Sequence, residues 1–137
     1  MKGRVLAGAS IAFGLMWLAA AALKIASPLE PYELVTHVVP SGTVSVAVLA
    51  AAVALEVALG VAMVTRAAQG FALTLAGLTL ASLVLWAVRL SASELVPCGC
   101  FGDFLGTTLD GALIRNGVLC AVLVALIVWS RRRARAV

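Results

Sequence analysis

The sequence has 137 residues, of which 64% are hydrophobic and 12% are charged. Soluble domains carry about 25% charged residues, so this composition excludes an ordinary soluble domain and indicates an integral membrane protein. The formal net charge of +4 does not indicate nucleic-acid binding, because the basic residues cluster just outside the apolar runs, as topology signals do.

The apolar runs predict an all-α protein with four membrane-spanning helices. Four spans of about 20 residues with short loops would use nearly the whole chain, so we expect a single membrane domain over residues 1–137. The spans are expected at about residues 5–26, 43–65, 70–90 and 109–130. The first run is longer than the core of a cleaved signal peptide, so we expect it to remain as a span.

A shorter helix is expected between the first two spans. Ser27-Pro28-Leu29-Glu30 resembles a helix start, with Ser27 as the N-cap and Glu30 completing a capping box. From Tyr32 to Val39, apolar residues recur at three- and four-residue spacing. This spacing predicts a short amphipathic helix lying at the membrane surface. At the fourth span, Thr107 or Thr108 is expected to cap the helix.

The distribution of basic residues predicts the orientation. With four spans, both termini share one face, and that face would hold seven of the ten Lys and Arg residues. Basic residues favour the cytoplasmic side, so we expect both termini in the cytoplasm and the protein in the cytoplasmic (inner) membrane. The loop before the fourth span would then lie on the outer face, where disulfides persist.

That loop contains two of the three cysteines, Cys98 and Cys100, separated only by Gly99. Their Cα atoms would lie roughly 5.5 to 7 Å apart, which overlaps the range that a disulfide tolerates. Gly99 and Gly102 widen the backbone conformations available to the loop. A strained, exposed disulfide exchanges more readily than a structural one, so the pair favours thiol–disulfide exchange with another protein.

Two other interpretations of the cysteines remain open. They could be structural, holding a turn in a membrane scaffold or assembly factor that is not an enzyme. Paired thiolates also suit Cu(I) or Zn(II), but a four-ligand zinc site would need two more ligands, and His37 is the only histidine. We therefore assign no metal ligand.

One ionisable residue lies deep in the second span. Glu56 is roughly 14 Å from the expected cytoplasmic end of its helix. The same depth in the third and fourth spans falls near Thr79 and Cys120, so the three residues could meet inside the bundle. An intramembrane carboxylate is a candidate for proton or quinone handling, or it could only tie helices together. A quinone is thus a candidate cofactor, although nothing in the sequence requires one.

Two basic residues lie near the outer ends of their helices. Lys24 and Arg115 could lower a cysteine pKa and favour the reactive thiolate, or their side chains could reach the lipid headgroups. Arg115 with Asn116 is the stronger candidate, because the pair opens the helix that follows the cysteine loop. Cys120 is expected to be an apolar thiol, too far along a fixed helix to reach the other cysteines.

The string Cys98-Gly99-Cys100-Phe101-Gly102, in the loop before the last of four spans, resembles the MauE family. This family belongs with the DoxX-like redox-associated membrane proteins. The resemblance is full-length, because Lys24 with Pro28, Glu56 with Gly60, and Arg115 with Asn116 also match the family's pattern.

The resemblance implies thiol–disulfide chemistry outside the cytoplasmic membrane, with Phe101 and Gly102 as part of the motif. The family's type protein is associated with maturation of the disulfide-rich small subunit of methylamine dehydrogenase, beside a thioredoxin-like partner. The expected function is therefore electron exchange between Cys98/Cys100 and such a partner. Nothing in this sequence specifies methylamine as the pathway.

Overall fold

The computed structural model describes residues 2–65, 70–91 and 108–134. Its described residues are almost entirely helical and contain no strand. The cysteine string lies outside the described residues. The helices in chain order are α1 (Lys2–Ala26), α2 (Leu29–Val38), α3 (Gly42–Val64), α4 (Gly70–Ser91) and α5 (Leu109–Ala134).

Four of these helices are long and apolar enough to cross a membrane. The qualifying segments are Arg4–Ala26, Gly42–Val64, Gly70–Leu90 and Leu109–Arg132. A bilayer needs about 20 apolar residues per helix, because the helix satisfies its own backbone hydrogen bonds within the hydrocarbon. The prediction of an all-α protein with four spanning helices is confirmed, and each segment ends within two residues of the expected span.

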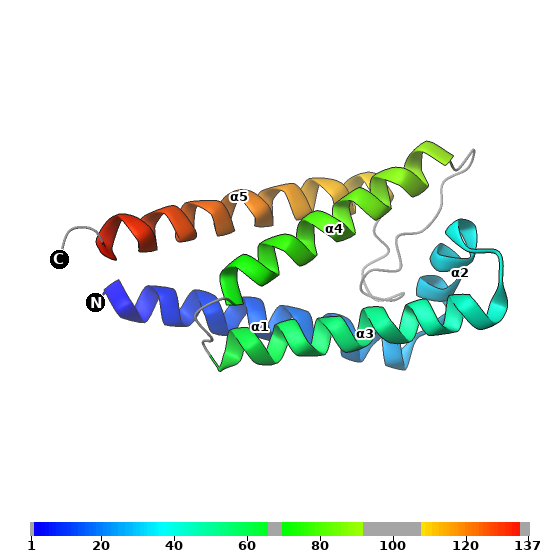
Figure 1. Cartoon of the computed structure of the whole chain (residues 1–137), viewed down its shortest axis with the longest axis horizontal. Coiled ribbons are helices and arrows are strands. Elements are labelled where there is room, and N and C mark those ends of the chain that lie inside the picture. Colours follow the sequence, from blue (N-terminus) through cyan, green and yellow to red (C-terminus); the bar gives the residue numbers. More distant parts are fainter. Residues whose placement is uncertain (1, 66–69, 92–107, 135–137) are drawn as a thin grey trace.

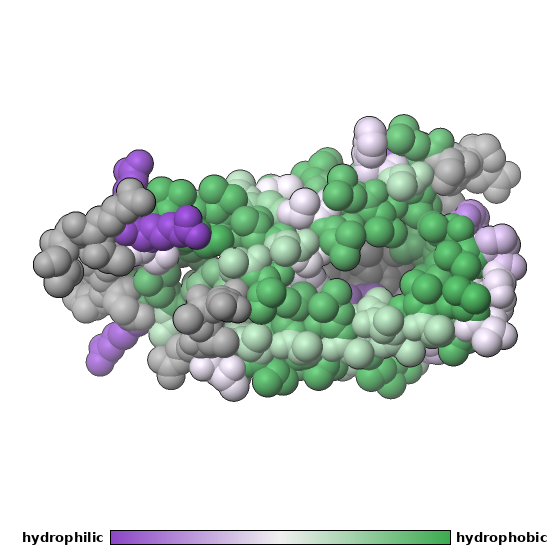
Figure 2. Space-filling model, in the orientation of Figure 1, coloured by the Kyte–Doolittle hydropathy of each residue, from purple (hydrophilic) through white to green (hydrophobic). Residues whose placement is uncertain are grey.

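The long helices form two antiparallel pairs, α1 with α3 and α4 with α5 (Figure 1). The beginning of α1 and the end of α5 lie at the same end of the bundle, which we call the terminal end. The short helix α2 lies at the other end, the α2 end. The face of the bundle in Figure 2 is mostly apolar between its two ends, as expected for a surface that faces lipid.

Glycines allow α1 and α3 to pack closely. A Cβ atom added to Gly14 would lie 2.9 Å from the carbonyl oxygen of Gly60, and one added to Gly60 would lie 3.1 Å from the carbonyl oxygen of Gly14. Small residues at such a crossing let two backbones approach within a membrane. Near the terminal end, the buried Ser10 donates a 2.5 Å hydrogen bond to the carbonyl oxygen of Met63. These contacts fix how α1 and α3 face each other.

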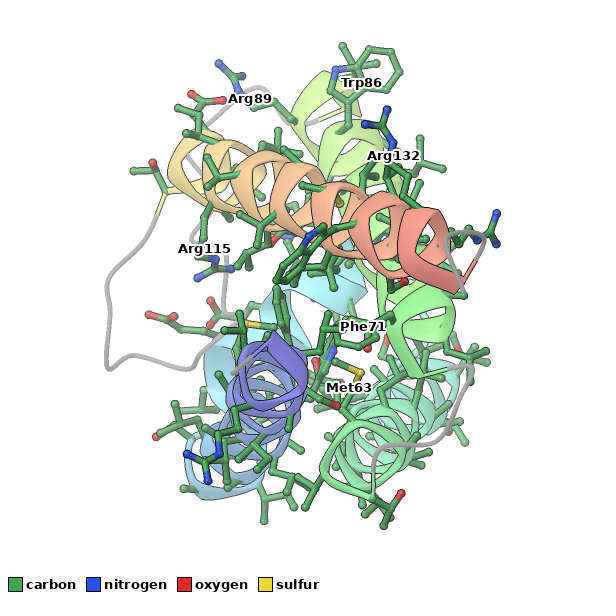
Figure 3. All side chains as sticks on the ribbon, turned by 90° about the vertical axis from the view of Figure 1, so that its left-hand side faces the viewer. Met63, Phe71, Trp86, Arg89, Arg115 and Arg132 are labelled. Carbon is green, nitrogen blue, oxygen red and sulfur yellow. The ribbon has the colours of Figure 1, made fainter. Side chains whose placement is uncertain are left out.

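One apolar cluster holds the two helix pairs together, and a second cluster joins α4, α5 and α2. The larger one draws residues from all four long helices: Phe13, Trp17, Leu59, Met63, Leu78 and Leu123. At its terminal end, Met63 and Phe71 lie between α3 and the start of α4 (Figure 3). The second cluster lies at the α2 end, where Leu34 of α2 packs against Leu85, Val88, Leu109 and Ala112. Because of this contact, α2 is docked on the bundle.

The structure corrects one expected helix start and supports another. Residue Pro28 takes the N-cap position of α2, and no side chain caps the helix, so the predicted Ser27–Glu30 capping box does not form. The backbone N–H of Ser27 donates to the carbonyl oxygen of Leu23 at 2.8 Å, and the carbonyl oxygen of Pro28 accepts from the N–H of Tyr32 at 3.0 Å, so the first turn of α2 starts at Pro28. At α5, Thr108 Oγ1 accepts a 3.2 Å hydrogen bond from the backbone N–H of Gly111, as expected for a capping threonine.

Candidate functional site

An ion pair joins α1 to α3 inside the bundle. Lys24 Nζ donates a hydrogen bond to Glu56 Oε1 at 2.5 Å, and the two side chains are only 11% and 13% exposed. A helical side chain leans toward the N-terminus of its own helix. Because α1 and α3 are antiparallel, Lys24 leans inward from the α2 end while Glu56 leans outward to meet it.

The ion pair corrects two expectations. Lys24 does not extend to the headgroups, because its amine is held by Glu56 within the bundle. Glu56 also does not meet Thr79, which is exposed and donates to the carbonyl oxygen of Leu75 in its own helix. Cys120 is partly buried and packs against the larger apolar cluster. Depth along a helix says nothing about the direction in which a side chain points.

The pair lines a cavity of about 410 Å³ between the two helix pairs. Its walls are formed by α1, α3, α4, α5 and the docked helix α2, and nearly all its lining residues are apolar. Some lining residues of α3 and α4 are also exposed at the surface, namely Val48, Leu55, Leu80 and Val84. The cavity therefore opens sideways, between α3 and α4, where a lipid tail would lie. Figure 2 shows a hollow on this face with a hydrophilic patch inside it.

The opening follows from the path of α4. Gly70 begins α4 beside α3, where an added Cβ would lie 3.0 Å from the sulfur of Met63. From there α4 diverges from α3 toward the α2 end (Figure 1). Two helices that touch at one end and separate at the other leave a wedge-shaped space between them, and the cavity occupies that space.

Three further residues bring polar atoms to the cavity wall. Arg115 and Asn116 lie on the second turn of α5, and Asn116 is only 4% exposed. Figure 3 shows the Arg115 side chain directed from α5 toward the α1 side of the bundle. Trp17 lines the cavity from α1 and is 7% exposed. The structure thus brings Lys24, Glu56, Arg115 and Asn116 to one cavity.

Neither the place of Trp17 in this site nor the pairing of Lys24 with Glu56 was predicted from the sequence. A signal for both was present. Lys24 and Glu56 are the only ionisable residues in the interior of the first two spans. Trp17 precedes Lys24 by seven residues, which is two helical turns on the same face.

The predicted cysteine motif, Cys98-Gly99-Cys100-Phe101-Gly102, lies outside the described residues. The helices on either side of it end and begin at the α2 end of the bundle (Figure 1). There Arg89 of α4 forms a 3.2 Å ion pair with Asp110 of α5. This ion pair and the second apolar cluster hold the two flanking helix ends together.

Within the part of the chain that the structure describes, no group of three or more His, Cys, Asp or Glu side chains could hold a metal ion. His37 is exposed on α2, with Nδ1 2.9 Å from the carbonyl oxygen of Glu33. Its ring is therefore engaged with its own helix. Cys98 and Cys100, the thiolates of the alternative metal-site interpretation, lie outside the described residues.

Comparison with known proteins gives one family. Residues 2–130 match the family model described as "Methylamine utilisation protein MauE". The match covers the four long helices, the cavity and the cysteine string. No match was found among the curated proteins or the solved structures.

Proposed function

Because the chain belongs to the MauE family of membrane proteins, we propose that it is a membrane-embedded thiol–disulfide redox protein. Cys98 and Cys100 exchange electrons with a thioredoxin-like partner outside the cytoplasm. The family's description is consistent with a membrane role in methylamine utilisation. Maturation of exported disulfide-containing proteins is the role proposed for this chain.

The place of the two cysteines in the chain is the observation that supports this proposal. They fall in the connection between α4 and α5. The Arg89–Asp110 ion pair holds the end of α4 beside the start of α5. Both helix ends lie opposite the terminal end, and the two termini with the connection between α3 and α4 carry seven of the ten Lys and Arg residues of the sequence. Under the rule that basic residues favour the cytoplasm, the connection between α4 and α5 faces the oxidising side.

The proposed exchange is a balanced dithiol–disulfide reaction. The thiolate of one cysteine attacks a sulfur of the partner's disulfide, forms a mixed disulfide and releases one partner thiolate. The second cysteine, as thiolate, then attacks the mixed disulfide and releases the other partner thiolate. The products are a Cys98–Cys100 disulfide and a partner dithiol. In this direction two electrons move to the partner. In the reverse direction, which disulfide formation in exported proteins requires, a partner dithiol is oxidised by the Cys98–Cys100 disulfide through the same mixed disulfide, and the Cys98/Cys100 dithiol is regenerated.

Trapping of single-cysteine variants tests the proposal. Cys98→Ser and Cys100→Ser, each in a Cys120→Ser background, would be expressed in the native membrane and quenched with an alkylating reagent. We expect one of them to accumulate a reductant-sensitive adduct with a thioredoxin-fold protein, identified by mass spectrometry, because the resolving thiol is missing.

The control is Cys120→Ser alone, which keeps both exchanging cysteines and is expected to show no accumulated adduct. Absence of an adduct from both single-cysteine variants, together with a Cys98/Cys100 pair that never changes its alkylation state, would refute exchange. That result would favour a membrane scaffold with structural cysteines.

A further inference from the structure

The thiol–disulfide exchange steps at Cys98 and Cys100 do not by themselves require a cavity in the bundle, yet the sideways-opening cavity has the properties of a ligand site. Its volume of about 410 Å³ lies within the range of roughly 300 to 1,000 Å³ that is typical of small-molecule sites. Its lining is mostly Leu, Val and Ala, and it opens between α3 and α4. A ligand that fits must therefore be largely apolar and must be able to enter from the bilayer.

The polar atoms of the cavity-lining residues indicate which hydrogen bonds the polar end of a ligand should make. Trp17 Nε1 and Glu56 Oε2 are both buried and have no hydrogen-bond partner among the described residues. One is a donor and the other is an acceptor. A buried polar group without a partner costs about 1–3 kcal/mol, so a ligand that bonds these atoms gains affinity.

Two basic side chains in the cavity wall, Lys24 and Arg115, favour a ligand that carries oxygen atoms as hydrogen-bond acceptors. The Lys24 amine lies on the same face of α1 as Trp17, two turns away, and each is part of the lining. Arg115 contributes a guanidinium from α5. A hydrocarbon tail offers no acceptor to these donors. Because nearly all of the lining is apolar, a charged phospholipid headgroup would lose most of its hydration in the cavity, whereas a neutral polar group would lose much less.

We propose that this cavity is the binding site of a membrane-soluble quinone. In its oxidised form, the carbonyl oxygens accept hydrogen bonds from Trp17 Nε1 or from the Lys24 amine. In its reduced form, the hydroxyl groups donate to the Glu56 carboxylate. The site thus offers both donors and an acceptor, and a quinone is an apolar ring whose oxygens change from acceptors to donors on reduction.

If the proposed thiol exchange holds, on which this step rests, the site would connect the exchange at Cys98 and Cys100 with the quinone pool. Oxidation of the Cys98/Cys100 dithiol to a disulfide releases two electrons and two protons. Reduction of one quinone to the quinol consumes the same two electrons and two protons, so the reaction balances without another reactant. Glu56 lines the cavity and is a group that can hold one of the protons.

Tryptophan fluorescence provides a test of binding, because the three tryptophans, Trp17, Trp86 and Trp129, can be reduced to one. The protein with Trp86→Phe and Trp129→Phe keeps only Trp17, at the cavity. The matched control, Trp17→Phe with Trp129→Phe, keeps only Trp86, which is 56% exposed on the outside of the bundle (Figure 3). Ubiquinone-1 would be titrated into each protein in nanodiscs. We expect saturable quenching of Trp17 and only a linear, partition-dependent decrease for Trp86.

Filling the cavity provides the second readout. Ala52 of α3 lines the cavity, whereas Ala54 is exposed on another face of the same helix and does not line it. Ala52→Phe is expected to raise the half-saturating quinone concentration roughly tenfold or more, a loss of at least about 1.4 kcal/mol. Ala54→Phe should leave it unchanged. If Ala52→Phe does not fold, Ala81→Phe fills the same cavity from α4.

Linear quenching of Trp17, equal affinity in the Ala52→Phe and Ala54→Phe proteins, or native mass spectra that contain only bound phospholipid would overturn the quinone site. All titrations would be repeated in a Cys98→Ser, Cys100→Ser protein. Binding there is independent of thiol exchange, so failure of the quinone site and failure of the proposed exchange give different results.

Discussion

Replacing Lys24 and Glu56, singly and together, tests whether their ion pair stabilises the packing of α1 against α3. Lys24→Met removes the amine that binds Glu56 and leaves a carboxylate that is only 13% exposed. Glu56→Met removes the counter-charge of Lys24. Each single change is therefore expected to destabilise the bundle, whereas the double change removes both charges and leaves two apolar side chains in an apolar wall.

The magnitude follows from the burial of the pair. Removing one partner of a buried ion pair costs about 3–5 kcal/mol, whereas replacing both partners by apolar residues is often close to neutral. We expect each single variant to lose about 3 kcal/mol in the free energy of unfolding, and the double variant to stay within about 1 kcal/mol of the wild type. The double-mutant cycle should then give a coupling energy of several kcal/mol.

The assay is detergent-induced unfolding of the purified protein in mixed micelles, followed by far-UV circular dichroism. The Arg89–Asp110 ion pair is a matched control, because its side chains are 48% and 60% exposed. Its coupling energy should fall below about 1 kcal/mol. If the Lys24 and Glu56 changes are simply additive, or if their coupling is no larger than that of the control pair, the two charges do not stabilise each other as argued.

Two further predictions concern packing. Gly14→Ala places a Cβ 2.9 Å from the carbonyl oxygen of Gly60 and should destabilise the bundle by about 1–3 kcal/mol. Gly8→Ala is the control and should not destabilise it, because a Cβ added there has nothing within 4 Å. Equal effects of the two changes in the same unfolding assay would contradict the proposed helix crossing. Ser45 is fully buried and donates a 2.7 Å hydrogen bond to the carbonyl oxygen of Val39. Ser45→Ala should cost about 1 kcal/mol and speed hydrogen exchange in the connection between α2 and α3; unchanged exchange would show that this bond does not hold the connection.

The spanning helices were predictable because their signal is local. A helix in hydrocarbon needs only enough consecutive apolar residues, and that requirement can be read from each segment alone. Even the capping role of Thr108 depends on a residue three positions away. The failed cap at Ser27 has a local cause as well, since the backbone N–H of Ser27 donates to the carbonyl oxygen of Leu23 at the end of α1 and is therefore not available to Glu30.

The site was only partly predictable because it depends on how the helices are rotated about their axes. Lys24, Glu56, Arg115 and Asn116 were recognisable from charge and position, and all four line the cavity. Depth alone suggested that Glu56 meets Thr79, and that was wrong.

The sequence by itself determined the membrane class, the four spans, the dithiol motif and the residues whose charge is out of place in a bilayer. Only the tertiary structure decided that Lys24 pairs with Glu56 and that α4 diverges from α3 to leave a cavity open to lipid. The physical reason for the ion pair is the close crossing at Gly14 and Gly60. This contact joins residues 46 positions apart and sets which faces of α1 and α3 meet, and hydrophobicity along a single helix carries no information about it.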